Sequence, residues 1–399
     1  MKNLLIISAV FPPEPVVSAS LSFDIANKLA DDNRVTVISP KPTRPFGFKF
    51  DKQFKNQKFK HFQLNSFTCA ESKLLGRLRE SYSFGKYSYK YIFDNHKQID
   101  LVYINTWPIF AGYFTVKAAK QFNIPVINHV QDIYPESLSS KLPVFSPLVN
   151  FLLLPIDKYI LKNASKIIAI SNNMKEYLAQ TRGIEKEKIE VVQNWQDENS
   201  FIEFSRTSRK INGNNNPFTF MYLGNIGPVA GIDILIEAFS SANIKNSRLV
   251  IAGSGSMKET LQRKVVDQNL KAIEFWDVPD GEVPKIQDQA DVMLLPIKKG
   301  AASSSVPSKL PAYMFSKKAI ISCVDESSAT ASVIKSSNCG WVLPPENSNA
   351  LAEKLIEVVV FEKSILFEMG MNGFNYALNT LSKKNNLNKL INILITKSA

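Results

Sequence analysis

The stretch from Leu4 to Ser39, LLIISAVFPPEPVVSASLSFDIANKLADDNRVTVIS, has the order strand, loop, helix, strand. Leu4–Ala9 is a continuous apolar run of the kind that forms a strand buried on both faces, and Arg34–Ser39 is a second strand. Between them, apolar residues recur at helical spacing from about Ala19 to Ala30. This order predicts the opening of a doubly wound parallel sheet, in which ligands gather at the carboxyl ends of the strands.

The alternation of strands and helices continues through most of the 399 residues, a length that predicts about two domains. It is interrupted at 205–217, where SRTSRKINGNNNP is polar and basic and has almost nothing to bury. We therefore predict an α/β protein with a Rossmann-like domain over 1–204, a linker over 205–217 and a second Rossmann-like domain over 218–374. The remaining residues, 375–399, are expected to form a helical tail that packs back toward the first domain.

The chain is basic, with 48 Lys and Arg against 36 Asp and Glu and a formal net charge of +12. Much of the excess lies between Lys41 and Asp100, a part that holds 13 basic and 5 acidic residues. Nucleic acid, an anionic membrane surface or a phosphorylated substrate would each complement it, and a solvated lysine-rich surface is the alternative without a partner. The segment contains no recognisable nucleic-acid-binding module, so we do not expect nucleic acid as a partner.

Within this basic part, the segment Lys73–Phe93 interleaves aromatic and cationic residues. Drawn as a helix, it gathers apolar side chains on one side and places its cations elsewhere. The apolar side holds Leu74, Leu75, Leu78, Tyr82 and Phe84, and the cations are Arg77, Arg79, Lys86 and Lys90. Such a helix suits the interface of an anionic membrane, but packing on the sheet with solvated lysine ends explains the pattern equally well.

Cysteine usage and the N-terminus both favour the cytoplasm. Cys69, Cys323 and Cys339 are odd in number and widely spaced, which argues against a disulfide framework or a zinc site. The apolar run at the N-terminus is short and is followed by prolines and Glu14, so it does not fit a cleaved signal peptide. No segment reaches the roughly 18 apolar residues that are needed to span a bilayer.

A second informative stretch is Asp291–Met314, DVMLLPIKKGAASSSVPSKLPAYM. It predicts a buried strand, a loop of small residues and a helix whose first turn carries Pro307, Ser308 and Lys309. Free backbone N–H groups at a helix start, together with a lysine, suit a phosphate group. An ordinary turn capped by a serine of the loop is the alternative.

Two other strand-end loops of the second domain carry glycine. They are Gly224-Asn225-Ile226-Gly227 and Gly253-Ser254-Gly255-Ser256, and neither has the full G-x-G-x-x-G pattern of a dinucleotide site. Because the strand ends of a parallel sheet share one edge, these loops and the loop before Lys309 outline one crevice of nucleotide size.

In the first domain, a strand-end loop contains Asp132 and Glu136, two carboxylates four residues apart. They could bind a sugar hydroxyl or move a proton. Capping of a following helix by Asp132 or Ser137 is the alternative.

Several of these segments resemble bacterial glycosyltransferases of family 4, which have the GT-B fold of two Rossmann-like doubly wound domains facing across a cleft. The resemblance covers nearly the whole chain. It rests on FPPE (11–14), QDIYPES (131–137), KIIAISNNMKEYL (166–178), YLGNIGP (222–228), GIDILIEAF (231–239), LVIAGSGS (249–256), ADVMLLP (290–296) and PSKLPAYM (307–314). The D-x-x-P-E-S and P-S-K-L segments are similar to the branch that includes N-acetyl-L-fucosamine transferases of O-antigen and capsule assembly.

The resemblance implies a retaining transfer of an N-acetylated amino or deoxyamino sugar from a UDP-sugar to a saccharide acceptor on polyprenyl diphosphate. It implies no metal and no cofactor beyond the UDP-sugar, and a peripheral place on the inner face of the bacterial cytoplasmic membrane. By matched position, Asp132, Glu136 and Lys309 would be catalytic, and Glu14, Ser18 and His129 would face the acceptor. The residues that would hold the donor are Gly224, Asn225, Gly227, Gly253, Ser254, Val278, Ser305, Pro307, Ser308 and Lys309.

The chain departs from the family pattern at several ligand positions. Two family glutamates correspond to Ser304 and Ala312, and a common basic residue corresponds to Ala230. Gln131 stands where a histidine is frequent, and Val17-Ser18 stands where a glycine pair is frequent. These departures favour, as an alternative, a noncatalytic or partner-dependent subunit that binds a sugar nucleotide. A UDP-sugar epimerase of the same fold is a further alternative, but its chemistry needs positioned histidines and the chain has only three.

Overall fold

The computed structural model describes residues 1–14, 16–44, 57–69, 73–105, 108–139, 143–207, 216–279, 281–300 and 307–395. They form two compact α/β units. The first unit comprises Met1–Asn194 and the chain from Leu387 onward, and the second comprises Trp195–Asn386. The structure therefore divides the chain after Asn194 and Asn386, whereas the sequence suggests boundaries after 204 and 374.

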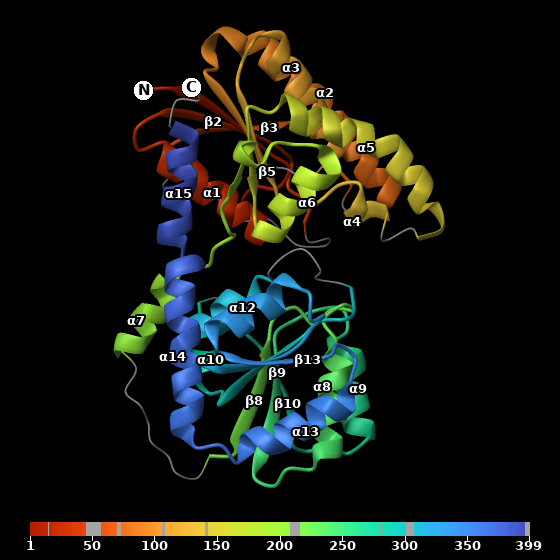
Figure 1. Cartoon of the computed structure of the whole chain (residues 1–399), viewed down its shortest axis with the longest axis vertical. Coiled ribbons are helices and arrows are strands. Elements are labelled where there is room, and N and C mark those ends of the chain that lie inside the picture. Colours follow the sequence, from red (N-terminus) through yellow and green to blue (C-terminus); the bar gives the residue numbers. More distant parts are fainter. Residues whose placement is uncertain are drawn as a thin grey trace. The chain divides into compact units, whose positions relative to one another are not determined.

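The first unit is built on a seven-stranded parallel sheet, seen in the upper half of Figure 1. The order across the sheet is β3-β2-β1-β4-β5-β6-β7. The strands are β1 (Asn3–Ser8), β2 (Arg34–Pro40), β3 (Lys60–Leu64), β4 (Leu101–Asn105), β5 (Val126–Val130), β6 (Lys166–Ala169) and β7 (Ile189–Val191). The direction of winding reverses between β1 and β4, and such a switch point is where open α/β sheets bind ligands.

The connections of the first unit are mainly helical. They are α1 (Val17–Leu29), α2 (Leu74–Asn95), α3 (Ile109–Gln121), α4 (Glu136–Ser139), α5 (Ser146–Asn163) and α6 (Asn172–Arg182), with short 3-10 turns η1 (His96–Gln98), η2 (Pro143–Phe145) and η3 (Lys186–Lys188). The sequence predicts neither β3 nor the true start of α5. β3 is a largely exposed edge strand without an apolar pattern, and α5 begins at Ser146 with Pro147 in its first turn.

Helix α2 forms where the aromatic and basic segment predicts it. It packs along α3 so closely that a Cβ added at Gly85 would lie 2.8 Å from the Phe110 carbonyl oxygen. One side of α2, which buries Phe84 and Ile92, therefore packs within the first unit, as the packing alternative predicts. The predicted apolar side is only partly correct, because the Leu75 side chain is exposed.

The second unit repeats the architecture with a six-stranded parallel sheet, in the order β10-β9-β8-β11-β12-β13. Its strands are β8 (Phe218–Leu223), β9 (Ser247–Ala252), β10 (Ile273–Trp276), β11 (Val292–Pro296), β12 (Ala319–Cys323) and β13 (Gly340–Leu343). Its helices are α7 (Asn199–Thr207), α8 (Ile232–Ala242), α9 (Lys258–Asp267), α10 (Val283–Asp288), α11 (Lys309–Phe315), α12 (Ala329–Ser337), α13 (Ser348–Val359) and α14 (Lys363–Thr380). The fold class predicted from the sequence, two doubly wound α/β domains, is confirmed.

Alternate residues of each central strand point to opposite faces, so each sheet is covered on both sides by an apolar core. In the second unit, Phe220 and Leu294 join one cluster, whereas Met221 and Leu295 join the other. The winding of this sheet reverses between β8 and β11. The carboxyl ends of these two strands therefore mark the expected site in this unit.

The last helix, α15 (Lys383–Ile395), has contacts of its own in each unit. At its start, the Glu198 carboxylate accepts hydrogen bonds from the N–H groups of Lys383 and Lys384 in the second unit. Near its end, the Lys2 ammonium donates to the Ile395 carbonyl in the first unit. Within the described residues, no helix combines the length and apolar character needed to cross a membrane.

Candidate functional site

The two glycine loops of the second unit lie side by side at the carboxyl edge of its sheet. Gly224 N–H donates to the Ala252 carbonyl at 3.0 Å, and Ile226 N–H donates to the Ser254 carbonyl at 2.8 Å. Gly253 N–H in turn donates to the Trp276 carbonyl. These bonds extend the sheet pairing past the strand ends, so the loops that follow β8, β9 and β10 form one continuous rim.

Glycine is required at the centre of this rim. Gly253 has φ = +132°, and a Cβ added there would lie 2.1 Å from the Gly224 carbonyl oxygen. A Cβ at Gly224 would lie 2.2 Å from Cε of Lys309. Any larger residue would push the two loops apart or displace the lysine, so the glycines let backbone and ammonium approach the same point.

Lys309 is the first residue of α11, and its side chain lies against the rim. Its Nζ is 4.8 Å from the centre of the Tyr222 ring. Burial lowers the pKa of Lys309 to about 8. Among the residues that the structure describes, no carboxylate or hydrogen-bond acceptor pairs with this ammonium, so a desolvated cation lies beside the two glycine loops. Such a cation favours an anionic ligand.

Two buried tyrosines hold the rim in place, and the sequence does not single them out. The Tyr313 hydroxyl, on α11, donates to the Leu223 carbonyl and accepts from the Leu223 N–H, both at 2.9 Å. The Tyr222 hydroxyl donates to the Asn225 carbonyl at 2.6 Å. Burial raises the pKa of both phenols above the ordinary value, so both stay protonated and able to donate.

The remaining residues predicted to hold the donor are placed unevenly. Ser308 is exposed and Pro307 is half-buried, and both precede α11, which begins at Lys309 rather than at Pro307. Val278 is half-buried in the loop after β10. Beside it, Lys258 joins two loops, donating to the Gly253 carbonyl at 3.0 Å and pairing with Asp277 at 2.6 Å. Ser304 and Ser305 lie outside the described residues.

In the first unit, the two predicted carboxylates, Asp132 and Glu136, follow β5. Asp132 is exposed. Glu136 begins α4 and accepts from Arg182 at 2.6 Å and from the Tyr177 hydroxyl at 2.7 Å. Burial opposes ionisation of Glu136, but the hydrogen bonds from Arg182 and Tyr177 outweigh it and lower the pKa of the carboxyl.

Arg182 is the centre of a buried ion cluster that the sequence does not predict. Its side chain is 1% exposed and also bonds Asp157 of α5 at 2.6 Å and the Tyr134 carbonyl at 2.7 Å. Burial raises the pKa of Asp157 to about 6, even though Arg182 pulls it down. One guanidinium therefore ties α6, α5 and the loop with Glu136 together.

The residues predicted to face the acceptor differ in access. His129 is buried, with the Tyr103 hydroxyl 2.7 Å from Nδ1 and the Gln131 amide 3.0 Å from Nε2, and burial lowers its pKa to about 3. Glu14 is also buried and accepts from the N–H groups of Thr43 and Arg44. Its burial raises the pKa of that carboxyl. Ser18 is exposed in the first turn of α1.

Comparison with known proteins identifies the family. The model described as "Glycosyl transferases group 1" matches residues 204–364, and the model described as "Glycosyltransferase Family 4" matches residues 20–199. Together the two matches take in most of the chain. The chain belongs to the group 1 and family 4 glycosyltransferases.

The curated relatives within these glycosyltransferases are distant. The chain is 21% identical over 253 residues to the probable glycosyltransferase WbjE of Pseudomonas aeruginosa, covering 59% of this chain and 60% of the relative. It is 24% identical over 156 residues to the putative colanic acid biosynthesis glycosyl transferase WcaI of Escherichia coli K12, covering 38% of each. The chain thus spans at most about 60% of the length of these two relatives.

Solved structures of other proteins share the fold. HepE (Alr3699) of Anabaena in complex with UDP has a TM-score of 0.70 and 17% identity, with all of both chains covered. The same protein in complex with UDP-glucose has a TM-score of 0.67 and 18% identity over the same coverage. The fold of this chain is therefore GT-B, as the resemblance implies.

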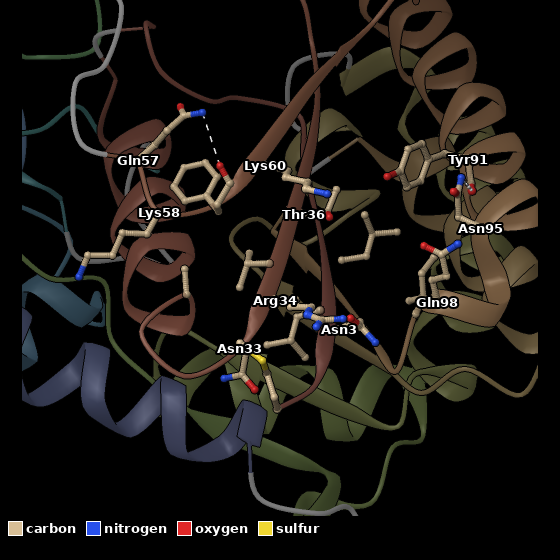
Figure 2. A pocket seen from close by; sticks show the side chains of 17 residues that line it. Asn3, Asn33, Arg34, Thr36, Gln57, Lys58, Lys60, Tyr91, Asn95 and Gln98 are labelled. Carbon is tan, nitrogen blue, oxygen red and sulfur yellow. Dashed lines mark hydrogen bonds between the residues drawn. The ribbon is translucent and has the colours of Figure 1, made fainter.

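A pocket of about 660 Å³ lies elsewhere in the chain, at the amino ends of β1, β2 and β3. Figure 2 shows Gln57 and Lys58 on one side of the strands and Tyr91 and Asn95 on the other. Several of its polar groups already have partners: Asn3 bonds Asp100, Lys58 bonds Asp31 and Asn33 bonds the Lys2 N–H. Because this pocket lies at the amino ends of the strands, it is separate from the loops at their carboxyl ends.

Within the ranges described, no three His, Cys, Asp or Glu residues gather as a metal site would require.

Proposed function

We propose that the chain transfers a sugar from a UDP-sugar to a saccharide acceptor. The observation that supports this most directly is Lys309, a half-buried ammonium next to the Gly224 and Gly253 loops. A desolvated cation beside two loops without bulky side chains complements a diphosphate. The complexes of HepE with UDP and with UDP-glucose support the choice of a uridine nucleotide.

In the proposed reaction, the bond between the sugar C1 and the UDP oxygen breaks while a bond from C1 to an acceptor hydroxyl oxygen forms. The hydroxyl attacks C1 from the face that the diphosphate leaves and gives its proton to the departing diphosphate, so UDP leaves and the anomeric configuration is retained. Lys309 stabilises the negative charge that develops on the leaving group, a contribution of about 10²–10³ in rate if it acts as an oxyanion-hole donor does. This arrangement needs neither a metal nor a cofactor besides the UDP-sugar.

The acceptor side of the proposal uses the first unit. Asp132 is the exposed carboxylate that would contact an acceptor hydroxyl, and Glu136 is held ionised beside it. Ser18 is open to the acceptor, whereas the buried Glu14 and His129 would act by supporting the loops around it. The name of WcaI, a putative colanic acid biosynthesis glycosyl transferase, supports a role in polysaccharide assembly. The acceptor in the proposal is an O-antigen or capsule saccharide on polyprenyl diphosphate, on the resemblance described above.

A lipid-linked acceptor requires the protein to work at a membrane. We assign it a peripheral position on the inner face of the bacterial cytoplasmic membrane, supported by the basic excess between Lys41 and Asp100. The donor sugar in the proposal is an N-acetylated amino or deoxyamino sugar, on the resemblance of the D-x-x-P-E-S and P-S-K-L segments.

The decisive test is thermal stabilisation of the full chain by a panel of nucleotide-sugars, followed by turnover with those that bind. Lys309→Met should keep the fold but lose stabilisation by UDP, because the shape of the side chain remains and its charge does not. Lys317→Met is the matched control, since Lys317 also lies over a ring, that of Phe374 at 4.7 Å. UDP stabilisation that survives in Lys309→Met would overturn the assignment of this site.

A noncatalytic or partner-dependent sugar-nucleotide subunit is the second candidate. It is favoured by Ala230, which is buried, and by Ala312, which packs against the apolar core, because neither supplies the polar group that the family carries there. Binding of UDP-sugars without turnover on any lipid-linked saccharide would support it. An epimerase would instead convert a UDP-sugar with no acceptor present, and nuclear magnetic resonance of the nucleotide fraction distinguishes the three outcomes.

A further inference from the structure

The start of α5 carries an exposed apolar surface. The stretch 143–156, PVFSPLVNFLLLPI, contains no charged residue. Five bulky side chains in it are exposed, and we call them the α5 ridge: Val144 (84%), Phe145 (58%), Leu148 (56%), Phe151 (77%) and Leu152 (57%). Phe145, Leu148 and Leu152 follow helical spacing and share one face of the helix. Monomeric proteins rarely expose a contiguous apolar patch of this kind, so the ridge is expected to have an occupant.

The ridge extends beyond the helix on which α5 packs. α5 contacts α3 through its second half, where Tyr159 meets Tyr113 at 5.2 Å between ring centres and Ile160 lies 3.2 Å from a Cβ placed on Gly112. Gly112 lies in the first turns of α3, and Lys120 near its end donates to Asn163. The two helices therefore run alongside each other, and the part of α5 before residue 156 projects past the start of α3.

This projection lies at the edge of the sheet that carries the loop after β5, which contains Asp132. α5 belongs to the crossover between the parallel strands β5 and β6, so its first residues lie toward their carboxyl ends. α4, which starts at Glu136, contacts α5 (Figure 1). Asp132 and Tyr134 also line a small cavity together with Asp157 of α5. The α5 ridge and the two predicted catalytic carboxylates, Asp132 and Glu136, thus belong to one edge of the first unit.

Lysines paired with aromatic rings accompany the ridge on the same layer of helices. Lys86 lies 5.2 Å from the Tyr82 ring centre on α2, Lys117 lies 5.9 Å from Tyr113 on α3, and Lys120 lies 5.8 Å from Tyr159 on α5. Tyrosine and lysine are the side chains that favour the headgroup level of a bilayer, and lysine is the electrostatic complement of anionic lipid. An apolar tip on a layer of helices that carries lysine–tyrosine pairs matches a lipid surface in both hydrophobicity and charge.

We infer that the α5 ridge inserts into the acyl boundary of a lipid bilayer and holds the acceptor edge of the first unit at the membrane. The reason for this docking rests on the proposed function, because a polyprenyl-linked saccharide presents its sugar at the lipid surface. Insertion of the α5 ridge can be distinguished from electrostatic attraction of the basic segment, Lys41 to Asp100, by the effect of salt on membrane binding. Ionic attraction is screened in about 1 M salt, where the Debye length is about 3 Å, whereas burial of apolar side chains persists.

The test is flotation of the full chain with vesicles of phosphatidylcholine and phosphatidylglycerol, in low salt and in about 1 M salt. The variant is Phe151→Ser with Leu152→Ser. The matched control is Val266→Ser with Val360→Ser, which removes apolar side chains of the second unit that are 75% and 77% exposed. Wild type and control should stay bound in high salt, and the ridge variant should partition at least about tenfold more weakly.

Two results would overturn the inference. One is high-salt vesicle binding by the ridge variant that equals wild type while its melting temperature is unchanged. The other is a wild-type dimer that the ridge substitutions convert to a monomer with vesicle binding unaffected, which would assign the ridge to a second copy of the chain. Failure of the proposed function is distinguishable, because it would remove stabilisation of wild type by UDP and leave the flotation result standing.

Discussion

The surroundings of Lys309 set its pKa, since burial alone lowers it to about 8. A diphosphate binds the protonated form, so affinity for UDP should fall as the pH rises through about 8. Titration calorimetry between about pH 7 and pH 9.5 measures this, and the Lys309→Met variant should show weak binding with no such slope. A slope of equal size in the variant would place the titrating group elsewhere.

The same lowered pKa has a consequence for stability. The folded pKa lies below the unfolded value of 10.5, so between about pH 8 and 10.5 the unfolded chain binds more protons and stability rises with pH. At pH 7 the desolvated charge is a cost, and Lys309→Met should raise the free energy of unfolding by up to about 3 kcal/mol. Denaturant unfolding of both proteins at pH 7 and at about pH 10 checks the sign, and the difference should shrink at the higher pH.

Single residues show where sequence reasoning ends. Lys309 is recognisable because it follows a strand and a small-residue loop, and a helix start in that order has a known chemistry. Tyr222 and Tyr313 look like ordinary core aromatics in the sequence, and only the fold shows that their hydroxyl groups fix the loop. Arg182 is separated from Glu136 by 46 positions, so no local pattern indicates their pairing. The roles proposed for Asp132, Glu136 and the donor residues stay predictions.

At the scale of elements, the packed glycine loops predict a difference between two substitutions. Gly253→Ala would place a Cβ 2.1 Å from the Gly224 carbonyl oxygen, whereas Gly281, also at positive φ (+84°), has no atom within 4 Å of its added Cβ. Both alanine variants have a strained backbone, so the difference between their melting temperatures measures the cost of the clash between the new Cβ at 253 and the Gly224 carbonyl oxygen. Gly253→Ala should abolish stabilisation by UDP and lower the melting temperature by several degrees more than Gly281→Ala. Equal melting temperatures with UDP binding intact would contradict the interlocked rim.

The buried ion cluster predicts the cost of separating three elements. Arg182→Ala leaves Asp157 and Glu136 without their cation and should destabilise the protein by about 3–5 kcal/mol. Arg263→Ala is the control, because Arg263 and Glu259 form an exposed pair whose loss should cost less than about 1 kcal/mol. The midpoints of urea unfolding compare the two. Similar midpoints would show that the cluster does not join α5, α6 and the loop.

The elements themselves were largely predictable. Buried strands such as Val292–Pro296 are continuous apolar runs, and their order with the helices is enough to define a doubly wound sheet. The exposed elements are not predictable in this way. β3 lacks an apolar pattern because it is an edge strand, and the sequence does not indicate the first turns of α5 because their apolar side chains face outward instead of marking a buried stripe.

For the whole molecule, the charge distribution predicts binding to anionic vesicles at low salt. Arg79, Lys86 and Lys90 replaced by Ser should weaken this binding, because each cation near the surface contributes about 1 kcal/mol. Arg77 is best left unchanged, since it pairs at 2.6 Å with Glu80, a buried carboxylate that also accepts from Arg44. Flotation at low salt is the measurement. Undiminished binding by the triple variant would leave the basic helix as a packing element alone.

Domain number and class follow from length and alternation, but the division of the chain depends on contacts that sequence does not reveal. The polar stretch at 205–217 suggests a boundary there, yet the two units separate after Asn194, and α7 (Asn199–Thr207) belongs to the second. The reason is physical: Phe201 buries its ring against the apolar core around Phe315. One buried aromatic residue outweighs the polar composition that follows it.

The half-buried ammonium of Lys309 also allows the site to be probed by chemical modification. An amine with a pKa of about 8 is uncharged in roughly one molecule in ten at pH 7, far more often than an ordinary lysine. The uncharged form is the nucleophile, so a trace of acylating reagent at neutral pH should modify Lys309 ahead of the solvated lysines. Peptide mass spectrometry would then report occupancy of the site, since a bound nucleotide shields this one nitrogen from acylation.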